Sequence, residues 1–402
     1  MHPSLRRRSG LGVGYVLFAA LFAAQASIMV LSPILPQIAE EFGVGTAGAA
    51  QLRSVSGVTA AVFALVLAVR GNRFRLSTLL YAGLALFAVA ALTCAVAPTF
   101  AVMIGAHVVI GLGLAAVLSG GVAASEVWAA DGQASRVLSW ALIGQPVAWV
   151  VGQPIVGLVS QGSWRWAWVV MPLASSLIAL AALALRDTSI SDEGQRCDPY
   201  GLWQEPGVKR WATSELLAFA AWGGALTYSG AVFIQAYDLG VGKVGLILGV
   251  GAVFYLPGNF LGRRWLEKGT GLLLVGFSLA AAVAVGVFSS ARTGLATAVV
   301  VFAVAVFFDG GRTIAGAAMG LGISNGRRLA AMSLRTSATQ LGYLLGASLG
   351  GILLDQWGFV GIGLGFGLLF ATAGLIQVPA TRSQAPSLAS AHRFLRRYQH
   401  QA

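Results

Sequence analysis

The sequence predicts an all-α polytopic membrane protein with twelve transmembrane helices in two similar six-helix bundles. Of the 402 residues, 57% are hydrophobic and only 10% are charged, whereas soluble domains carry about 25% charged residues. The charges also leave long gaps, since none of the 50 positions between Arg75 and Glu126 holds a Lys, Arg, Asp or Glu. The 53 glycines suit close packing of helices in lipid.

Apolar runs longer than about 18 residues predict helices that cross a bilayer. The first six predicted spans, in chain order, are 11–34, 46–69, 77–97, 101–124, 137–160 and 166–185. The second six are 213–236, 243–261, 270–289, 294–320, 330–354 and 358–378. We therefore expect an N-terminal bundle over 1–185, a polar cytoplasmic linker over 186–212, a C-terminal bundle over 213–380 and a basic cytoplasmic tail over 381–402.

The first span has an alternative interpretation as a cleavable signal peptide. Three arginines precede an apolar run that contains the small-residue sequence Ala24-Gln25-Ala26, which resembles a cleavage site. The apolar run continues to Leu31, which is longer than a signal peptide needs. We favour a retained first helix.

The formal net charge of +12 does not indicate a nucleic-acid-binding face, because the 26 basic residues lie in short clusters between apolar runs. With the N-terminus inside, the cytoplasmic loops and tails hold 20 of them, the outside loops hold three, and three lie within spans. This asymmetry predicts two cytoplasmic termini and a plasma-membrane protein, with the bacterial inner membrane as the expected site. We expect a monomer.

The two halves repeat each other weakly. Gly152, Gly157 and Trp164 have counterparts at offsets of 194, 194 and 193 residues, which are Gly346, Gly351 and Trp357. Internal duplication of this kind is typical of transporters, whose substrate site lies between the repeats. The same glycines also suit tight helix packing, and the two roles overlap.

Several motifs together resemble the major facilitator superfamily, in particular its twelve-helix drug:proton antiporter branch and related sugar and nucleoside exporters. The resemblance covers nearly the whole chain. It rests on the sequence around Pro33 and Pro36 that closes the first span, on Gly111-Leu112-Gly113 in the fourth, and on Gly152-Gln153-Pro154-Ile155-Val156-Gly157 in the fifth. The resemblance implies the major facilitator fold and export of a small molecule in exchange for protons.

The chain also departs from the family pattern. The loop after the second span keeps the cations Arg70, Arg73 and Arg75 but has Asn72 where the family has an Asp. The helix-four Arg of the family is replaced by His107, and Gln153 stands where a Gly normally precedes Pro154. The first departure, Asn72, puts in doubt the charge relay by which the family locks its conformations.

Ionisable residues inside spans point to function, because each costs roughly 2.5 to 3.5 kcal/mol to insert. Five lie well inside the predicted spans: Arg53, His107, Asp309, Arg312 and Arg335. Arg53 either faces the central cavity or extends to the outer interface. His107 either faces the cavity or is a packing histidine inside the bundle.

Asp309 and Arg312 lie three residues apart on one helix face and can pair. With Arg335, they form either a structural lock between the tenth and eleventh spans or an anion site or proton-sensitive gate. Polar and aromatic residues of the seventh and eighth spans are candidates for lining a mixed pocket: Trp222, Tyr228, Gln235, Tyr255 and Asn259. Cys94 and Cys197 show no metal-ligand spacing, and we expect no cofactor or metal.

These observations predict a secondary transporter that works by alternating access, and not an enzyme. The resemblance implies protons as the coupling ion. Uptake or facilitated transport of a small organic anion is the alternative that the buried cations favour. A non-transporting receptor on a transporter fold also stays open. No phosphate-binding P-loop is present, which excludes an ATP-driven pump on this chain.

Overall fold

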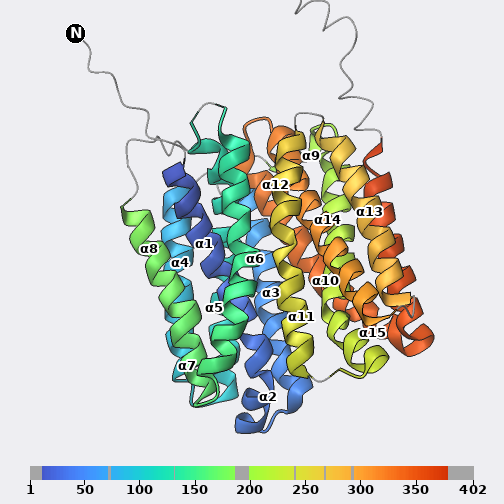
Figure 1. Ribbon diagram of the computed structural model, residues 1–402. Coiled ribbons are helices and arrows are strands. Elements are labelled where there is room, and N and C mark those ends of the chain that lie inside the picture. The colour runs from blue at the N-terminus through green and yellow to red at the C-terminus, as the bar shows by residue number, and fades with distance from the viewer. Residues whose placement is uncertain are drawn as a thin grey trace, which may run out of the picture.

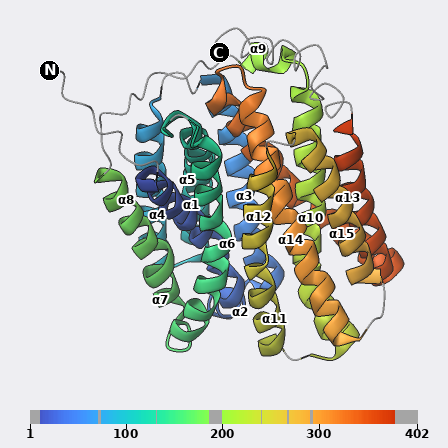
Figure 2. The same ribbon diagram turned by 45° about the horizontal axis from the view of Figure 1, so that its top comes forward.

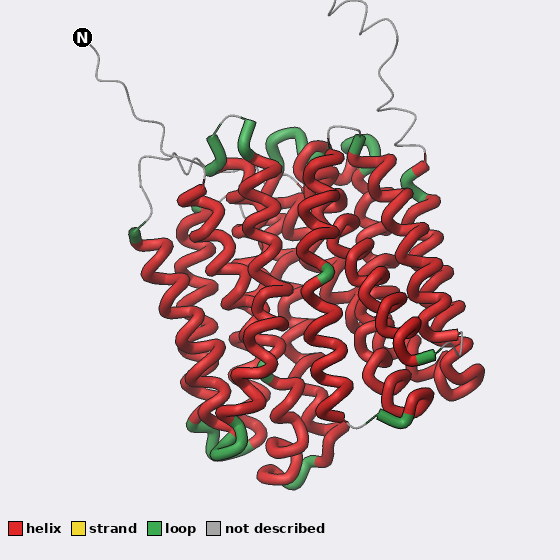
Figure 3. Tube along the Cα trace, in the orientation of Figure 1, coloured by secondary structure: helices red, strands yellow, loops and turns green. Residues whose placement is uncertain are grey.

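The computed structural model describes residues 11–70, 74–130, 132–185, 199–239, 241–266, 269–290 and 294–378. Over this part of the chain the regular structure is helical and no strand occurs (Figure 3). Helices of the first half lie on one side of Figure 1 and helices of the second half on the other. The all-α membrane fold that the composition predicts is confirmed.

Six predicted spans of the first half are all present as helices. Their bounds are α1 Leu11–Met29, α2 Leu31–Phe42, α3 Gly45–Arg70, α4 Leu76–Ala95, α5 Phe100–Val127, α6 Ala134–Val159, α7 Trp164–Trp168, the π-helix η2 Val169–Leu173, and α8 Ala174–Ala184. The first predicted span is thus divided between α1 and α2. The sixth is one span of α7, η2 and α8, which the π-turn around Pro172 joins.

The second half begins after a short helix, α9 Pro199–Gln204. It consists of α10 Val208–Tyr237, α11 Val241–Val253, α12 Tyr255–Trp265, α13 Thr270–Ser290, α14 Leu295–Gly322 and α15 Arg328–Leu375. The eighth predicted span is divided between α11 and α12. Residues 186–198 of the predicted linker and the whole predicted tail lie outside the described residues.

α10 begins five residues before the predicted start at 213, so its first turns fall in what we expected to be linker. The polar residues Lys209 and Arg210 suggested a loop there. Val208 and Trp211, at helical spacing, are instead fully buried and hold these turns against the bundle. This shift moves Glu215 from the first turn of the predicted span to two turns inside the helix.

Eleven described helical segments are long and apolar enough to cross a membrane. The last one, α15, has 48 residues and contains two spans, because Gly358 has the non-helical angles φ 60° and ψ −153°. The chain reverses there: a Cβ atom on Gly361 would lie 2.7 Å from the carbonyl oxygen of Leu353. α15 is therefore a hairpin of the predicted eleventh and twelfth spans.

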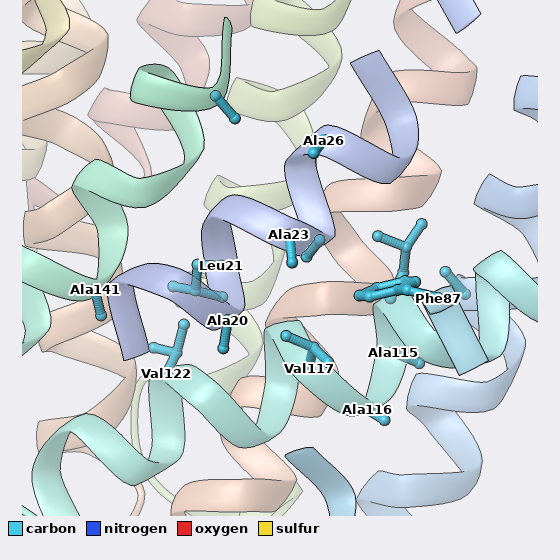
Figure 4. Close-up of a cluster of buried hydrophobic side chains, with 14 of the residues drawn as sticks. Ala20, Leu21, Ala23, Ala26, Phe87, Ala115, Ala116, Val117, Val122 and Ala141 are labelled. Atoms are coloured by element: carbon cyan, nitrogen blue, oxygen red, sulfur yellow. The ribbon is translucent and has the colours of Figure 1, made fainter. Parts of the chain in front are cut away.

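Small side chains let the helices of the first half pack closely. Alanines of α1, α5 and α6 fill the space between these helices with few larger groups such as Leu21 and Phe87 (Figure 4). At Gly144 of α6, a Cβ atom would lie 2.4 Å from the backbone oxygen of Phe18 on α1. This is the close approach that the abundance of glycine and alanine predicts.

The two ends of the bundle differ in how the halves meet. We call them the α9 side, where α1 and α10 begin and α5 and α14 end, and the α2 side (Figures 1 and 2). The buried core of the first half continues into the second through residues near the α9 side, among them Trp211, Met319, Leu329 and Met332. A separate core cluster fills the rest of the second half. The halves are therefore packed together on the α9 side.

Candidate functional site

A buried cluster of charged side chains joins three helices of the second half. Glu215 of α10 accepts a hydrogen bond from Arg312 Nη2 of α14 at 2.7 Å through one carboxylate oxygen. Its other oxygen accepts one from Arg335 Nε of α15, also at 2.7 Å. The side chains of Glu215 and Arg312 are fully buried and that of Arg335 is 9% exposed. One carboxylate thus binds two guanidinium groups.

Backbone and aromatic groups complete this cluster. Arg312 donates to the carbonyl oxygen of Ser214 at 3.2 Å, and Arg335 donates to that of Thr313 at 3.3 Å. The ring of Phe219 lies 5.6 Å from Arg312 Cζ and 5.4 Å from Arg335 Cζ, within the range of cation–π attraction.

Glu215 corrects the pairing that the sequence indicated. We expected Asp309 to pair with Arg312, with Arg335 leaving one net positive charge. The spacing of three residues allows that pair, but Glu215 faces both arginines from the neighbouring helix and binds both. Asp309 and Glu215 together balance the two arginines, so the four groups sum to zero. Glu215 falls near the start of the predicted span 213–236, and as the acidic residue of that span it was the signal in the sequence.

Asp309 lies in the middle of α14 and is 2% exposed. Among the described residues, no ion pair or hydrogen bond joins its carboxylate to another side chain. It interacts electrostatically with the Glu215 cluster, and with Tyr255 of α12 and Tyr343 of α15. The protein therefore holds one carboxyl group close to the cluster but outside its hydrogen bonds.

Arg53 of α3 points toward the second half. Its Nη2 donates to Gln340 Oε1 of α15 at 3.4 Å, and its charge interacts with Tyr343 of the same helix. The side chain is partly buried, and within the described chain it forms no ion pair with a carboxylate. Of the two interpretations of Arg53, this position agrees with the one that faces the interior.

His107 is 2% exposed and belongs to the interior of the first half. Its Nδ1 donates to the carbonyl oxygen of Met103, one turn earlier on α5, at 2.9 Å. The ring stands at 88° to that of Trp168, with 5.5 Å between the centroids. These contacts are those of a packing histidine.

The other pocket candidates lie at different places. Trp222 is 7% exposed in the core of the second half, and the Tyr228 hydroxyl donates to the carbonyl oxygen of Ala347 at 2.8 Å. Asn259 is fully buried, with no partner for its Nδ2 among the described residues. Tyr255 is the only one of these candidates that interacts with Asp309. The side chain of Gln235 lies outside the described residues.

Polar contacts connect the two halves directly. Ser119 of α5 donates to Thr336 of α15 at 3.0 Å, and Ser337 donates to the carbonyl oxygen of Ala61 on α3 at 2.5 Å. Ser139 of α6 donates to Asn259 of α12 at 2.5 Å. At the α9 side itself, Arg328 forms an ion pair with Glu126 at 2.8 Å. These contacts place the candidate site between the halves, with its α9 side closed.

The motif glycines differ in their surroundings. A Cβ atom would lie 2.6 Å from a backbone oxygen at Gly111, 2.7 Å from the Phe87 ring at Gly113 and 2.0 Å from a backbone oxygen at Gly346. It would lie 2.6 Å from a methionine methyl group at Gly152 and 3.3 Å from the Tyr228 hydroxyl at Gly351, and would meet open space at Gly157.

The remaining motif residues lie in α6 and beside the loop between α3 and α4. Pro154 is inside α6. Arg70 and Arg75 are exposed at the helix ends that flank this loop, whereas Asn72 and Arg73 lie outside the described residues.

Comparisons with known proteins agree with this architecture. The sequence pattern of the Major Facilitator Superfamily matches residues 17–324 of this chain. The chain is 26% identical over 263 residues to an uncharacterized MFS-type transporter, YceJ of Bacillus subtilis, covering 63% of this chain and 66% of that protein. It is 26% identical over 227 residues to the efflux pump apf11 of Gibberella fujikuroi, covering 54% of this chain and 37% of the pump. The matches span less than two thirds of either relative.

Solved structures show the same fold at low identity. The human organic anion transporter MFSD10 (TETRAN) superposes with a TM-score of 0.76 at 14% identity, covering 94% of this chain and all of that one (100%). The fucose:proton symporter FucP of E. coli superposes with a TM-score of 0.71 at 15% identity, covering 92% of this chain and 98% of that one. The family match over residues 17–324 and the shared fold identify this chain as a membrane transporter, not an enzyme, of the Major Facilitator Superfamily.

Proposed function

We propose that the protein exports a small molecule by alternating access and that Asp309 carries the coupling proton. The observation that carries this proposal is a buried carboxyl group that no arginine binds directly. An antiporter needs a group that gains and loses a proton as the site alternates between the two faces of the membrane. Glu215 is less suited to this role, because both of its carboxylate oxygens already accept hydrogen bonds from arginines.

The position of Asp309 also supports the proposal. It interacts electrostatically with Tyr255 of α12 and Tyr343 of α15, and Tyr343 interacts in turn with Arg53 of the first half. A movement of the halves would change the distance between Arg53 and this group. The proton affinity of Asp309 would then differ between the two conformations, as coupling requires.

A ligand must be found before the coupling is tested. Purified protein is screened for thermal stabilisation by sugars, nucleosides, organic anions and cationic drugs, since a ligand at 100 times its dissociation constant stabilises by roughly 2.7 kcal/mol. The hit is then used in liposomes for two assays, uptake driven by a pH gradient and counterflow. Binding without counterflow would indicate the receptor alternative.

The decisive variant is Asp309→Asn. We expect it to lose transport driven by a pH gradient and to keep counterflow, because exchange requires no net proton movement. Asn keeps the shape of Asp, and Glu215 still binds both arginines, so the variant should fold. Normal pH-driven transport by Asp309→Asn would exclude the proton role. Gln340→Ala, which removes the hydrogen-bond partner of Arg53 and leaves Asp309 intact, should remain responsive to the pH gradient.

A small organic anion is a second candidate substrate class, and Arg53 favours it. A partly buried guanidinium that faces the other half without a carboxylate partner can bind a carboxylate or phosphate through paired hydrogen bonds. The human organic anion transporter shares the fold, though at 14% identity this shows the fold alone.

Arg53→Lys tests the anion interpretation. Lys keeps the charge but cannot form the paired hydrogen bonds, so affinity for an anionic ligand should fall by about tenfold or more. Arg165→Lys, an exchange on the α2 side within the first half, is the control. Equal affinity in Arg53→Lys and the wild type would exclude Arg53 as the anion ligand.

We further propose that the α9 side faces the cytoplasm of a plasma membrane, with 1–185 and 213–380 as the moving halves, because most basic residues belong to this side. Cys197, outside the described residues, is a native reporter for the linker. An impermeant thiol reagent applied to intact cells should not label it, whereas it should label Gln161→Cys, an exposed position in the turn after α6. Labelling of Cys197 without labelling of Gln161→Cys would show that the α9 side faces outward instead.

A further inference from the structure

A pocket of about 570 Å³ lies on the α9 side, where α9 meets the beginning of α10. Its lining includes Tyr200 and Trp203 of α9, Glu205 and Gly207 of the connecting turn, and Lys209 and Arg210 of α10. The candidate membrane span of α10 starts at Val208, so the pocket lies at the level where the chain enters the membrane. None of its lining residues belongs to the charged cluster around Glu215.

Among the described residues that line it, the pocket carries an uncompensated positive charge. Glu205, the only acidic residue among its lining residues, is already bound by Arg327 at 2.8 Å and by Asn325 at 3.1 Å. Lys209 and Arg210 therefore have no carboxylate partner in the pocket. Arg210 Nε is buried and has no hydrogen-bond partner in the described part of the chain. Two cations and an unused donor indicate an anionic ligand.

The backbone adds further donors. α10 begins after Gly207, which has a positive φ of 91° and provides no side-chain cap. The N–H of Val208 already donates to the carbonyl oxygen of Glu205 and that of Trp211 to Gly207, which leaves the N–H groups of Lys209 and Arg210 without a backbone partner in the described chain. Unpaired N–H groups at the start of a helix favour phosphate.

Exposed aromatic residues indicate what carries the anion. Tyr200 is 77% exposed and Trp203 is 44% exposed, while Leu202 between them is 2% exposed and anchors α9 to the protein. Lys209 Nζ lies 5.9 Å from the centroid of the Trp203 ring. Tyr and Trp prefer the headgroup level of a bilayer, where an apolar body and a polar tip are both accommodated.

We propose that this pocket binds the phosphate headgroup of an anionic phospholipid, with Lys209 and Arg210 as its ligands and Tyr200 and Trp203 lying in the interface beside it. The lipid would fix α9, and with it the end of the linker, on the membrane surface. This site is independent of the transported substrate and of the coupling mechanism.

Native mass spectrometry of the full-length protein tests the proposal, with phosphatidylglycerol as the probe and phosphatidylcholine as the neutral comparison. Wild-type protein should bind phosphatidylglycerol preferentially. A basic residue near the surface contributes about 1 kcal/mol, so Lys209→Gln with Arg210→Gln should weaken binding by about thirtyfold. Arg264→Gln, at an exposed position on the same side, is the matched control and should change it little.

A second measurement is independent of charge. Doxyl-labelled phosphatidylglycerol should quench tryptophan fluorescence in the wild type, and Trp203→Phe should remove part of that quenching. This readout applies even if the double variant fails to fold. Wild-type affinity in the double variant, an equal loss in Arg264→Gln, or equal quenching in Trp203→Phe would each overturn the proposal. Tighter binding of soluble glycerol 3-phosphate than of the lipid would also overturn it.

Discussion

At the scale of single residues, the two acidic groups of the second half have different environments although they lie close together. Glu215 uses both oxygens to bind Arg312 and Arg335, whereas Asp309 has no such partner in the described part of the chain. A buried ion pair is costly to break, because the group that remains is charged and unpaired. The two carboxyl groups should therefore respond differently to removal of their charge.

We predict that Glu215→Gln lowers the free energy of unfolding by about 3 to 5 kcal/mol, because it leaves two buried guanidinium groups without the carboxylate that binds them. Asp309→Asn is the matched control and should change stability far less. The measurement is the thermal unfolding midpoint and folded yield of both variants in the same detergent. Comparable loss in the two variants would mean that Asp309 shares the structural role.

The sequence indicates which charges are buried but not which of them pair. Asp309, Arg312 and Arg335 stand out because long apolar runs surround them. Glu215 does not, since Lys209, Arg210 and Glu205 precede it and make the region resemble a loop. Its role depends on packing between α10 and α14: a Cβ atom on Gly316 would lie 2.4 Å from Glu215 Oε1. A contact between helices far apart in the sequence is not contained in the spacing of either one.

At the scale of helices, glycines that look equivalent in the repeated motif have different consequences. Gly346 lets α15 approach α10 so closely that a Cβ atom would lie 2.0 Å from the backbone oxygen of Ala220. Its counterpart Gly152 meets only the flexible ends of Met29 and Met171, and Gly157 faces open space. The weak repeat therefore predicts the two related halves but not which glycine is essential for packing.

We predict that Gly346→Ala destabilises the protein by about 1 to 3 kcal/mol, the usual effect of overpacking, because rigid backbone cannot move aside. Gly157→Ala should leave the unfolding midpoint unchanged or raise it slightly, since Ala favours a helix over Gly. Thermal unfolding of both variants gives the comparison. A tolerated Gly346→Ala would show that α10 and α15 can separate without loss.

A corner on the α2 side joins three helical segments through one carboxylate. Glu41 of α2 accepts hydrogen bonds from the Trp164 indole and from Arg165, while Arg165 also donates to the carbonyl oxygens of Ala95 and Ala97 at 3.0 Å. Burial raises the pKa of Glu41, but the bonds from Trp164 and Arg165 outweigh it and hold the pKa below its ordinary value of 4.5.

This corner predicts an acid-dependent contribution to stability. Because the folded-state pKa of Glu41 is lowered, the contribution is complete above the ordinary value and is lost as the pH falls through the lower, folded-state value. The difference in unfolding midpoint between wild type and Glu41→Gln should be constant near neutral pH and shrink below about pH 4.5. The exposed neighbour variant Glu40→Gln is the control. A difference that stays constant in acid would contradict the pairing.

At the scale of the whole molecule, the halves meet through many small contacts on the α9 side and few charged ones. Hydrogen bonds from Ser119, Ser139 and Ser337 cross the interface, and the buried core is continuous there. The charge distribution predicts the spans and their direction because both depend on local composition. It cannot predict which side is closed, since that depends on how two separately folded halves fit together.

The ion pair between Glu126 and Arg328 gives the last prediction, because it joins the two halves across the closed side. The pair is 2.8 Å long and its side chains are 26% and 33% exposed, so it contributes about 0.2 to 1 kcal/mol. Reversing either charge alone should therefore favour opening of the α9 side, changing the ratio of closed to open molecules by about 1.4- to 5-fold or more.

The distance between the halves can be measured with spin labels at Ser135→Cys and Gly322→Cys, which are both exposed on this side, in a protein with Cys197 replaced by Ser. Glu126→Arg and Arg328→Glu should each broaden the distance distribution toward longer values, and the double exchange should restore it, because the charges again attract. A double variant that stays open would show that the local packing, and not the ion pair, holds this side closed.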